Sequence, residues 1–133
     1  MTNTQNFRPN ALKHIFEGEI NRSGSAMGYH YEMILDTPGT VIDGTISATN
    51  SSGVYEAKVK VNDVLKSGNG GTSTFFPKDM TPQGVVNAIN EAYNNKTYVQ
   101  GNTYRETSGS GLKIEMFIDQ NGNIISAFPV YEN

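Results

Sequence analysis

Two histidines, His14 and His30, are the side chains best able to exchange protons near neutral pH in this chain of 133 residues. They lie on either side of a segment rich in Gly and Ser. One imidazole can remove a proton while the other donates one, which is what cleavage of RNA through its own 2′-OH requires. A nearby Lys or Arg would stabilise the charge that develops on the phosphate. The pair therefore favours metal-independent transesterification of RNA, which would spare DNA because DNA has no 2′-OH.

Other uses of these residues fit the sequence less well. The chain has no Cys and no HExxH motif, so two His fall short of the usual metal-ligand set, and we expect neither a metal nor a cofactor. A serine hydrolase would need a G-x-S-x-G turn, which is absent. Taken singly, each His is more often a structural residue.

The elements that must position the histidines can be predicted from the apolar spacing. Leu12, Ile15 and Phe16 form one helical stripe after Pro9, which predicts a helix over residues 9–18 with His14 off the stripe. Residues 19–28 are predicted as a loop. Residues 29–35 alternate as in a strand, with His30 on the face opposite the Tyr, Met and Leu side chains.

The rest of the chain predicts further strands and a second helix. Strands are expected over 54–61, 97–107, 112–118 and 124–131, the last two joined by a hairpin turn at 119–123, and a helix over 82–94. Residues 66–73 are predicted as a loop, and Phe75 and Phe76 as core. This order indicates an α+β fold, with two or three helices against antiparallel sheet, in a single domain over residues 1–133.

The composition of the chain limits the classes of partner that it can bind. The net charge is −3 and 36% of the residues are hydrophobic, which argues against a general nucleic-acid coat and against disorder. Residues 54–78 still leave room for a local phosphate-binding patch, because they hold Lys58, Lys60, Lys66 and Lys78. No apolar run approaches the ~20 residues of a membrane-spanning helix, and the start of the chain lacks the apolar core of a signal peptide, so we expect no membrane partner.

Three segments in order along the chain match a known family. KHIFEGEINRSGSAMGYHYE (13–32) resembles the two-histidine segment of the EndoU endoribonucleases, and STFFPKDMTPQGVVNAINEA (73–92) resembles their bacterial branch. DQNGNIISAFPVY (119–131) resembles the final hairpin of the family. The resemblance implies an α+β, EndoU-like fold. It also implies cleavage of RNA beside uridine, leaving a 2′,3′-cyclic phosphate and a 5′-OH.

The resemblance also implies roles for single residues. His30 matches the family histidine usually assigned as general base, which leaves His14 as the acid. The family places a catalytic Lys close before a Ser-Thr pair, but here Gly70, Gly71 and Thr72 stand in that position. Lys66 is then the first substitute and Lys58 the second, and a solvated surface position is the ordinary alternative for both.

For the substrate, the resemblance assigns four further residues. Ser126 would hydrogen-bond the uracil edge, and Phe128 would stack on the base. Ser73 and Thr74 would help to frame the pyrimidine. The ordinary alternative for Phe128 is a buried strand aromatic, and for Thr74 a residue at the start of a strand.

Relatives of this kind occur as C-terminal domains of secreted or contact-delivered toxins. The resemblance therefore implies RNA as substrate, with a tRNA anticodon loop as one target, and a cognate immunity protein as partner. It implies delivery as part of a larger toxin and action in the cytoplasm of a target cell. The alternative is an inactive binding module of the same fold, because the expected lysine position is not filled.

Overall fold

The structure is a computed structural model that describes residues 1–132. Its α-helices are α1 (Ala11–Glu17) and α2 (Pro82–Asn94). The first six strands are β1 (Glu19–Ile20), β2 (Ala26–Met27), β3 (Gly39–Val41), β4 (Tyr55–Val61), β5 (Val64–Leu65) and β6 (Thr72–Phe75). The last four are β7 (Thr97–Gln100), β8 (Thr103–Thr107), β9 (Lys113–Ile118) and β10 (Ile124–Pro129). A short 3₁₀ turn, η1 (Gly68–Gly71), precedes β6.

The C-terminal strands form one antiparallel sheet in the order β10-β9-β8-β7. Leu112, Ile114, Met116 and Ile118 are buried, as their alternation predicts. Helix α2 packs on this face through its apolar stripe, and its first turn is capped by the Thr81 hydroxyl, which accepts a hydrogen bond from the backbone N–H of Gly84. The side chains that alternate with the buried row on β9, Glu115 among them, lie on the other face and are free to line a site.

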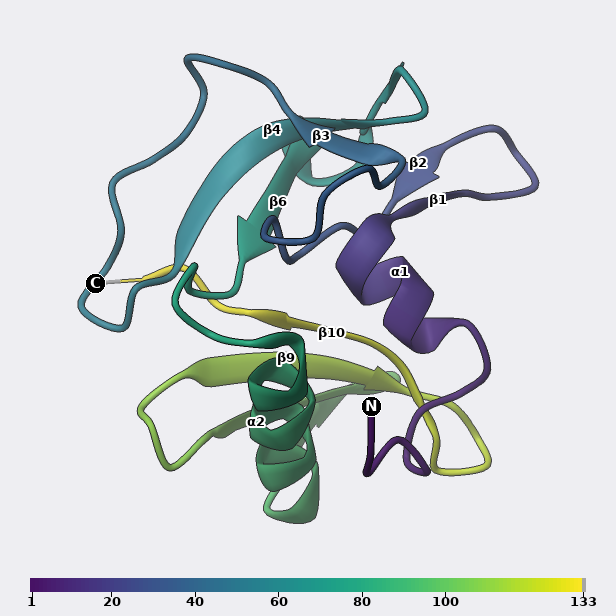
Figure 1. Cartoon of the computed structure of the whole chain (residues 1–133). Coiled ribbons are helices and arrows are strands. Elements are labelled where there is room, and N and C mark those ends of the chain that lie inside the picture. Colours follow the sequence, from purple (N-terminus) through teal and green to yellow (C-terminus); the bar gives the residue numbers. More distant parts are fainter. Residues whose placement is uncertain (133) are drawn as a thin grey trace.

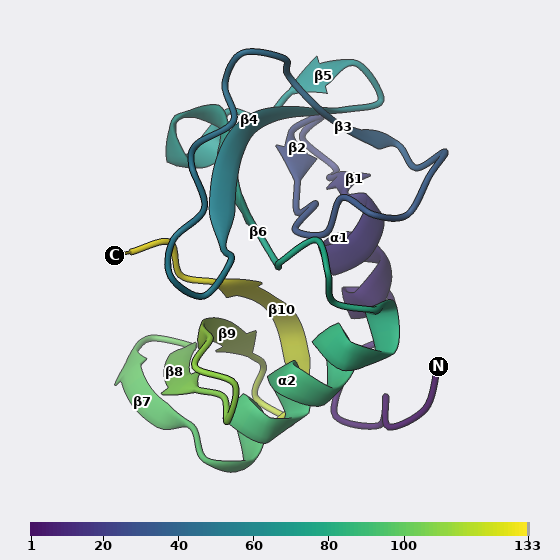
Figure 2. The same cartoon turned by 60° about the vertical axis from the view of Figure 1, so that its left-hand side comes forward.

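The second sheet is built around β4, which pairs with β3, β5 and β6. Tyr55, Ala57, Val59 and Val61 are all buried, as the alternation in this strand predicts. Figure 1 shows this sheet above the C-terminal sheet, with α1 beside the place where they meet. Figure 2 shows β7 to β10 together with α2 across them. The antiparallel α+β architecture predicted from the sequence is thereby confirmed.

Helix α1 begins two residues later than the predicted span, because Asn10 adopts a left-handed backbone conformation and caps the helix instead of joining it. Gly18 ends the helix, and its N–H bonds the carbonyl of His14. The predicted loop contains a small hairpin, in which Glu19 pairs with Met27 and Ile20 with Ala26. The chain thus turns back beside the histidine that the helix carries.

The predicted strand over residues 29–35 is wrong. Tyr29 has a φ of 71°, and the segment joins none of the sheets. The backbone N–H of His30 instead donates to the carbonyl of Ile15, and its carbonyl accepts from Phe76. Because the segment is covered on both sides, Tyr29, His30 and Tyr31 are all buried, whereas Leu35 is 84% exposed.

Within the described part of the chain, no helix is long and apolar enough to cross a membrane.

Candidate active site

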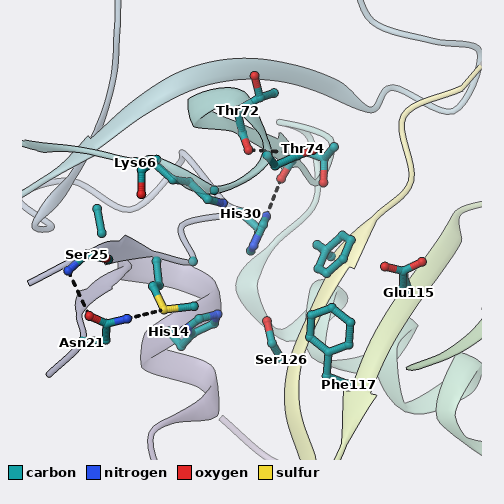
Figure 3. A pocket seen from close by; sticks show the side chains of 17 residues that line it. His14, Asn21, Ser25, His30, Lys66, Thr72, Thr74, Glu115, Phe117 and Ser126 are labelled. Atoms are coloured by element: carbon teal, nitrogen blue, oxygen red, sulfur yellow. Dashed lines mark hydrogen bonds between the residues drawn. The ribbon is translucent and has the colours of Figure 1, made fainter. Parts of the chain in front are cut away.

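One cleft, of about 630 Å³, brings together the predicted histidines and most of the other candidate residues. It lies between the C-terminal sheet and the elements that carry His14, His30 and Lys66, as Figure 3 shows. The lining also includes Thr74, Ser126 and Phe128 from the predicted set, and Asn21, Ser25, Met27, Thr72, Glu115 and Phe117 from outside it.

His14 lies in the last turn of α1 and is oriented by an acid. Its Nδ1 is 2.9 Å from Oε1 of Glu19, the first residue of β1. A carboxylate only accepts hydrogen bonds, so Nδ1 carries the proton and Nε2 is left for the cleft. The carboxylate accepts this hydrogen bond whether or not Nε2 also carries a proton, so the ring can hold a proton on Nε2 without losing the contact. This arrangement suits a proton donor.

His30 is also held through Nδ1, but by a neutral acceptor. Its Nδ1 donates to the backbone carbonyl of Thr74 at 2.8 Å, which leaves Nε2 of the neutral ring as an acceptor. Burial holds the pKa of His30 well below its ordinary value, and the positive charge of Lys66 acts in the same direction. The ring stacks on Phe128 at 5.2 Å between centroids. A neutral, fixed imidazole of this kind suits a proton acceptor.

Lys66 follows β5 and points into the cleft. Its backbone lies beside Ala26 of the β1–β2 hairpin, and its N–H donates to the carbonyl of Val59. Its Nζ donates to the Ser73 hydroxyl at 2.8 Å, and that hydroxyl donates to the carbonyl of Gly28 at 3.0 Å. Burial lowers the pKa of Lys66 to about 8. The ammonium is therefore fixed in place and loses its proton more easily than a surface lysine.

Of the two candidate lysines, only Lys66 lines the cleft. Lys58 is exposed on β4 and does not line the cleft. It alternates with the buried row of that strand, so its position on the outer face follows from the pleat.

Ser73 also lies outside the cleft lining, because it is buried behind Lys66 and both of its hydrogen bonds are internal. Thr74 lines the cleft, and its hydroxyl oxygen is buried with no hydrogen-bond partner among the described residues. Such an oxygen is available to a ligand that can reach it.

The far end of the cleft is formed by β9 and β10. Ser126 pairs with Phe117 and Phe128 with Glu115 across the two strands, so these four side chains share one face. Phe117 meets Phe128 edge-on at 5.6 Å. Glu115 is bonded to Arg105 of β8 at 2.6 Å. Two aromatic rings and a hydroxyl at one end of the cleft form a surface suited to a flat, polar-edged base.

Sequence reasoning missed Glu19, Met27, Glu115 and Phe117. Phe117 had a usable signal, because an aromatic on the polar face of an amphipathic strand is unusual. Glu19 had none, since its contact with His14 depends on the turn at Gly18. Among residues 1–132, no three His, Asp or Glu side chains lie close enough to hold a metal ion.

The site is a cleft in an α+β fold in which a buried neutral imidazole, a carboxylate-bound imidazole and a lysine meet, an arrangement suited to acid–base chemistry on a phosphate ester. A profile of the family described as bacterial EndoU nuclease matches residues 9–131. This match spans the whole cleft, and the chain belongs to that family.

A curated relative, described as a toxin of Bacillus cereus, is 57% identical over 129 residues, which cover 97% of this chain and 24% of the toxin. The chain thus spans about a quarter of the length of that relative. No solved structure matches the chain.

Proposed function

We propose that this chain is the nuclease domain of a bacterial toxin, a single domain that cleaves RNA beside uridine by transesterification. The observation that carries the proposal is the difference between the acceptors that hold the two histidines, a neutral carbonyl for His30 and a carboxylate for His14. The buried His30 ring, bonded to the Thr74 carbonyl, keeps Nε2 free to accept a proton, whereas His14, bonded to the Glu19 carboxylate, can carry a second proton on Nε2 and donate it.

In the proposed reaction, Nε2 of His30 removes the proton of the 2′-OH. The 2′-oxygen then attacks the adjacent phosphorus, and the bond from phosphorus to the 5′-oxygen breaks. His14, which carries a second proton on Nε2 while Nδ1 stays bonded to Glu19, gives that Nε2 proton to the departing oxygen. The products are a 2′,3′-cyclic phosphate and a 5′-OH, and DNA is not cut because it has no 2′-OH. Lys66, held by Ser73, stabilises the negative charge on the phosphate in the transition state.

Uridine is proposed to bind at the β9–β10 end of the cleft. Phe128 offers its ring to the base, and Ser126 and Thr74 offer hydroxyls, which can both donate and accept hydrogen bonds. The unpaired Thr74 oxygen supports this placement, because uracil carries an N–H that could bond it. Ser73 would act on the substrate only through Lys66.

The longer toxin of Bacillus cereus supports a proposal about how this domain is delivered and where it acts. The printed description of that protein is a toxin, and this chain matches about a quarter of it. We propose that the domain is delivered as part of a larger secreted or contact-delivered protein and acts in the cytoplasm of a target cell. There a tRNA anticodon loop would be one substrate, and a cognate immunity protein would protect the producing cell.

The test is cleavage of a uridine-containing RNA in EDTA by wild type, His14→Ala and His30→Ala, with product ends identified by mass spectrometry. Cyclic phosphate ends from wild type, and their loss in both variants, are expected. A DNA oligonucleotide of the same sequence is the control, and cutting it at a similar rate would contradict the mechanism. Well-folded wild type that cuts none of several RNAs would favour an inactive binding module.

A further inference from the structure

The β1–β2 hairpin lines the end of the cleft that lies away from the proposed uridine site. Asn21, Ser25 and Met27 belong to this end. Figure 3 shows Asn21 and Ser25 on the side opposite Phe117 and Glu115, with His14 and Lys66 between them. Met27 is 40% exposed, although its neighbour Ala26 is buried. The hairpin therefore presents one large apolar side chain to the cleft.

This apolar side chain is held in place. The Asn21 amide group donates to the sulfur of Met27 at 3.1 Å. The Asn21 carbonyl oxygen accepts from the backbone N–H groups of Ser23 and Ser25, at 3.0 and 2.9 Å. One side chain thus orders the turn of the hairpin and fixes the thioether, so Met27 is less free than an ordinary surface methionine.

Met27 also lies next to the proton donor. It pairs with Glu19 across the hairpin, and Glu19 binds His14. In the proposed function, His14 protonates the departing 5′-oxygen, so that oxygen must lie within hydrogen-bond distance of the His14 ring. The nucleoside that carries it must therefore begin beside His14. Since the uridine occupies the Phe128 end, the hairpin end is the space left for this nucleoside.

We infer that Met27 forms a binding subsite for the base of the nucleoside on the 3′ side of the cut. A thioether packs favourably on an aromatic ring, and a purine offers the larger ring surface. The subsite thus favours uridine followed by a purine. This inference rests on the proposed function and adds to it the direction in which the RNA crosses the cleft.

The test compares two substrates with the same uridine and scissile phosphate. Uridylyl-adenosine has a 3′ nucleoside, whereas uridine 3′-methyl phosphate has only a methyl group in its place. The readout is the ratio of kcat/KM for the first to that for the second, measured by chromatography of the cyclic product. Met27→Ala is expected to lower this ratio about fivefold, and Met27→Leu, which keeps an apolar side chain, less than twofold. Met33→Ala is the matched control, because Met33 is 42% exposed and lies outside the cleft.

The outcomes separate the two proposals. A ratio lowered by Met27→Ala and unchanged by Met33→Ala supports the subsite. An unchanged ratio in Met27→Ala, with both substrates cleaved, overturns the subsite and leaves the proposed function intact. Equal losses on both substrates also overturn it, since Met27 would then act on the reaction and not on the 3′ base. If folded wild type cleaves neither substrate, the proposed function fails and the subsite fails with it.

Discussion

Lys66 is half-buried in the cleft and must be protonated to help a phosphate react. The Ser73 hydroxyl holds its ammonium, and Lys58 has no such position. We expect Lys66→Ala to lower kcat/KM on a uridine-containing RNA by at least about tenfold, which corresponds to ~1.4 kcal/mol. Lys58→Ala is the control and should remain within about twofold of wild type. Equal rates for wild type and Lys66→Ala would remove this lysine from the mechanism.

The pH dependence of the rate follows from the same residues. His30 must be neutral to act as base, and its pKa is held well below 6.5, so activity should persist below that pH. On the alkaline side the rate should fall above about pH 8, where Lys66 becomes neutral. Log kcat/KM against pH is the measurement. The fall near pH 8 should be missing in Lys66→Ala, and its persistence there would show that another group causes it.

Phe128 has two expected roles, because its ring supports His30 and offers a surface to the base. Phe128→Ala removes both and should lower kcat/KM by about tenfold or more, since stacking on a base alone is worth ~1 to 3 kcal/mol. Phe128→Tyr keeps the ring and should retain most of the activity. Single-turnover cleavage beside a thermal melt of each variant tests this. Full activity in a folded Phe128→Ala protein would contradict both roles.

At the scale of elements, Gly28 joins the β1–β2 hairpin to the segment that carries His30. Its φ is +78°, and a Cβ there would collide with the backbone carbonyl of His14. Gly24, in the same hairpin, has a φ of +83° and open space around it. Gly24→Ala should therefore cost only the ~1 to 2 kcal/mol of a left-handed alanine. Gly28→Ala should cost more and also displace His14, so that activity falls with stability.

Denaturant unfolding and RNA cleavage of these two glycine variants provide the comparison. Equal losses of stability in Gly24→Ala and Gly28→Ala would mean that the backbone can relieve the collision with the His14 carbonyl at no cost in free energy. Wild-type activity in a folded Gly28→Ala protein would mean that His14 does not depend on this turn.

The elements that could be predicted from the sequence are those whose stability is mainly local or whose burial is one-sided. Helix α2 has a cap, a Pro in its first turn and a regular apolar stripe, so it begins at Pro82 as predicted. Strand β4 is buried on one face and alternates accordingly. The 29–35 segment failed because its hydrogen bonds go to Ile15 and Phe76, which are distant contacts that no local pattern encodes.

The candidate site also has residues that could be predicted from the sequence and contacts that could not. The residue types His14, His30 and Lys66 pointed to the chemistry, and the fold brings all three to one cleft. Their partners could not be predicted, because Glu19 reaches His14 only through the turn at Gly18, and Ser73 reaches Lys66 across two elements. The Ser73 hydroxyl, which the resemblance predicts to frame the pyrimidine, thus lies outside the cleft lining and is hydrogen-bonded to Lys66.

At the scale of the whole molecule, an acidic chain must bind an anionic substrate through a local patch. The net charge is −3, and among the described residues that line the cleft Lys66 is the only Lys or Arg. We expect kcat/KM at low RNA concentration to fall with salt, with a shallow slope of about −0.7 per phosphate contacted in log–log form. A rate that does not change between low and high salt would contradict binding through such a patch.

The stack between His30 and Phe128 also has a consequence for how the protein is made. His14, His30 and Lys66 belong to the first half of the chain, whereas Phe128 lies on β10, the last strand of the described residues. A growing chain therefore carries all of the groups for proton transfer long before it has the surface that orients them. Because Phe128 is supplied by β10, the proposed RNA cleavage should require that β10 has paired with β9.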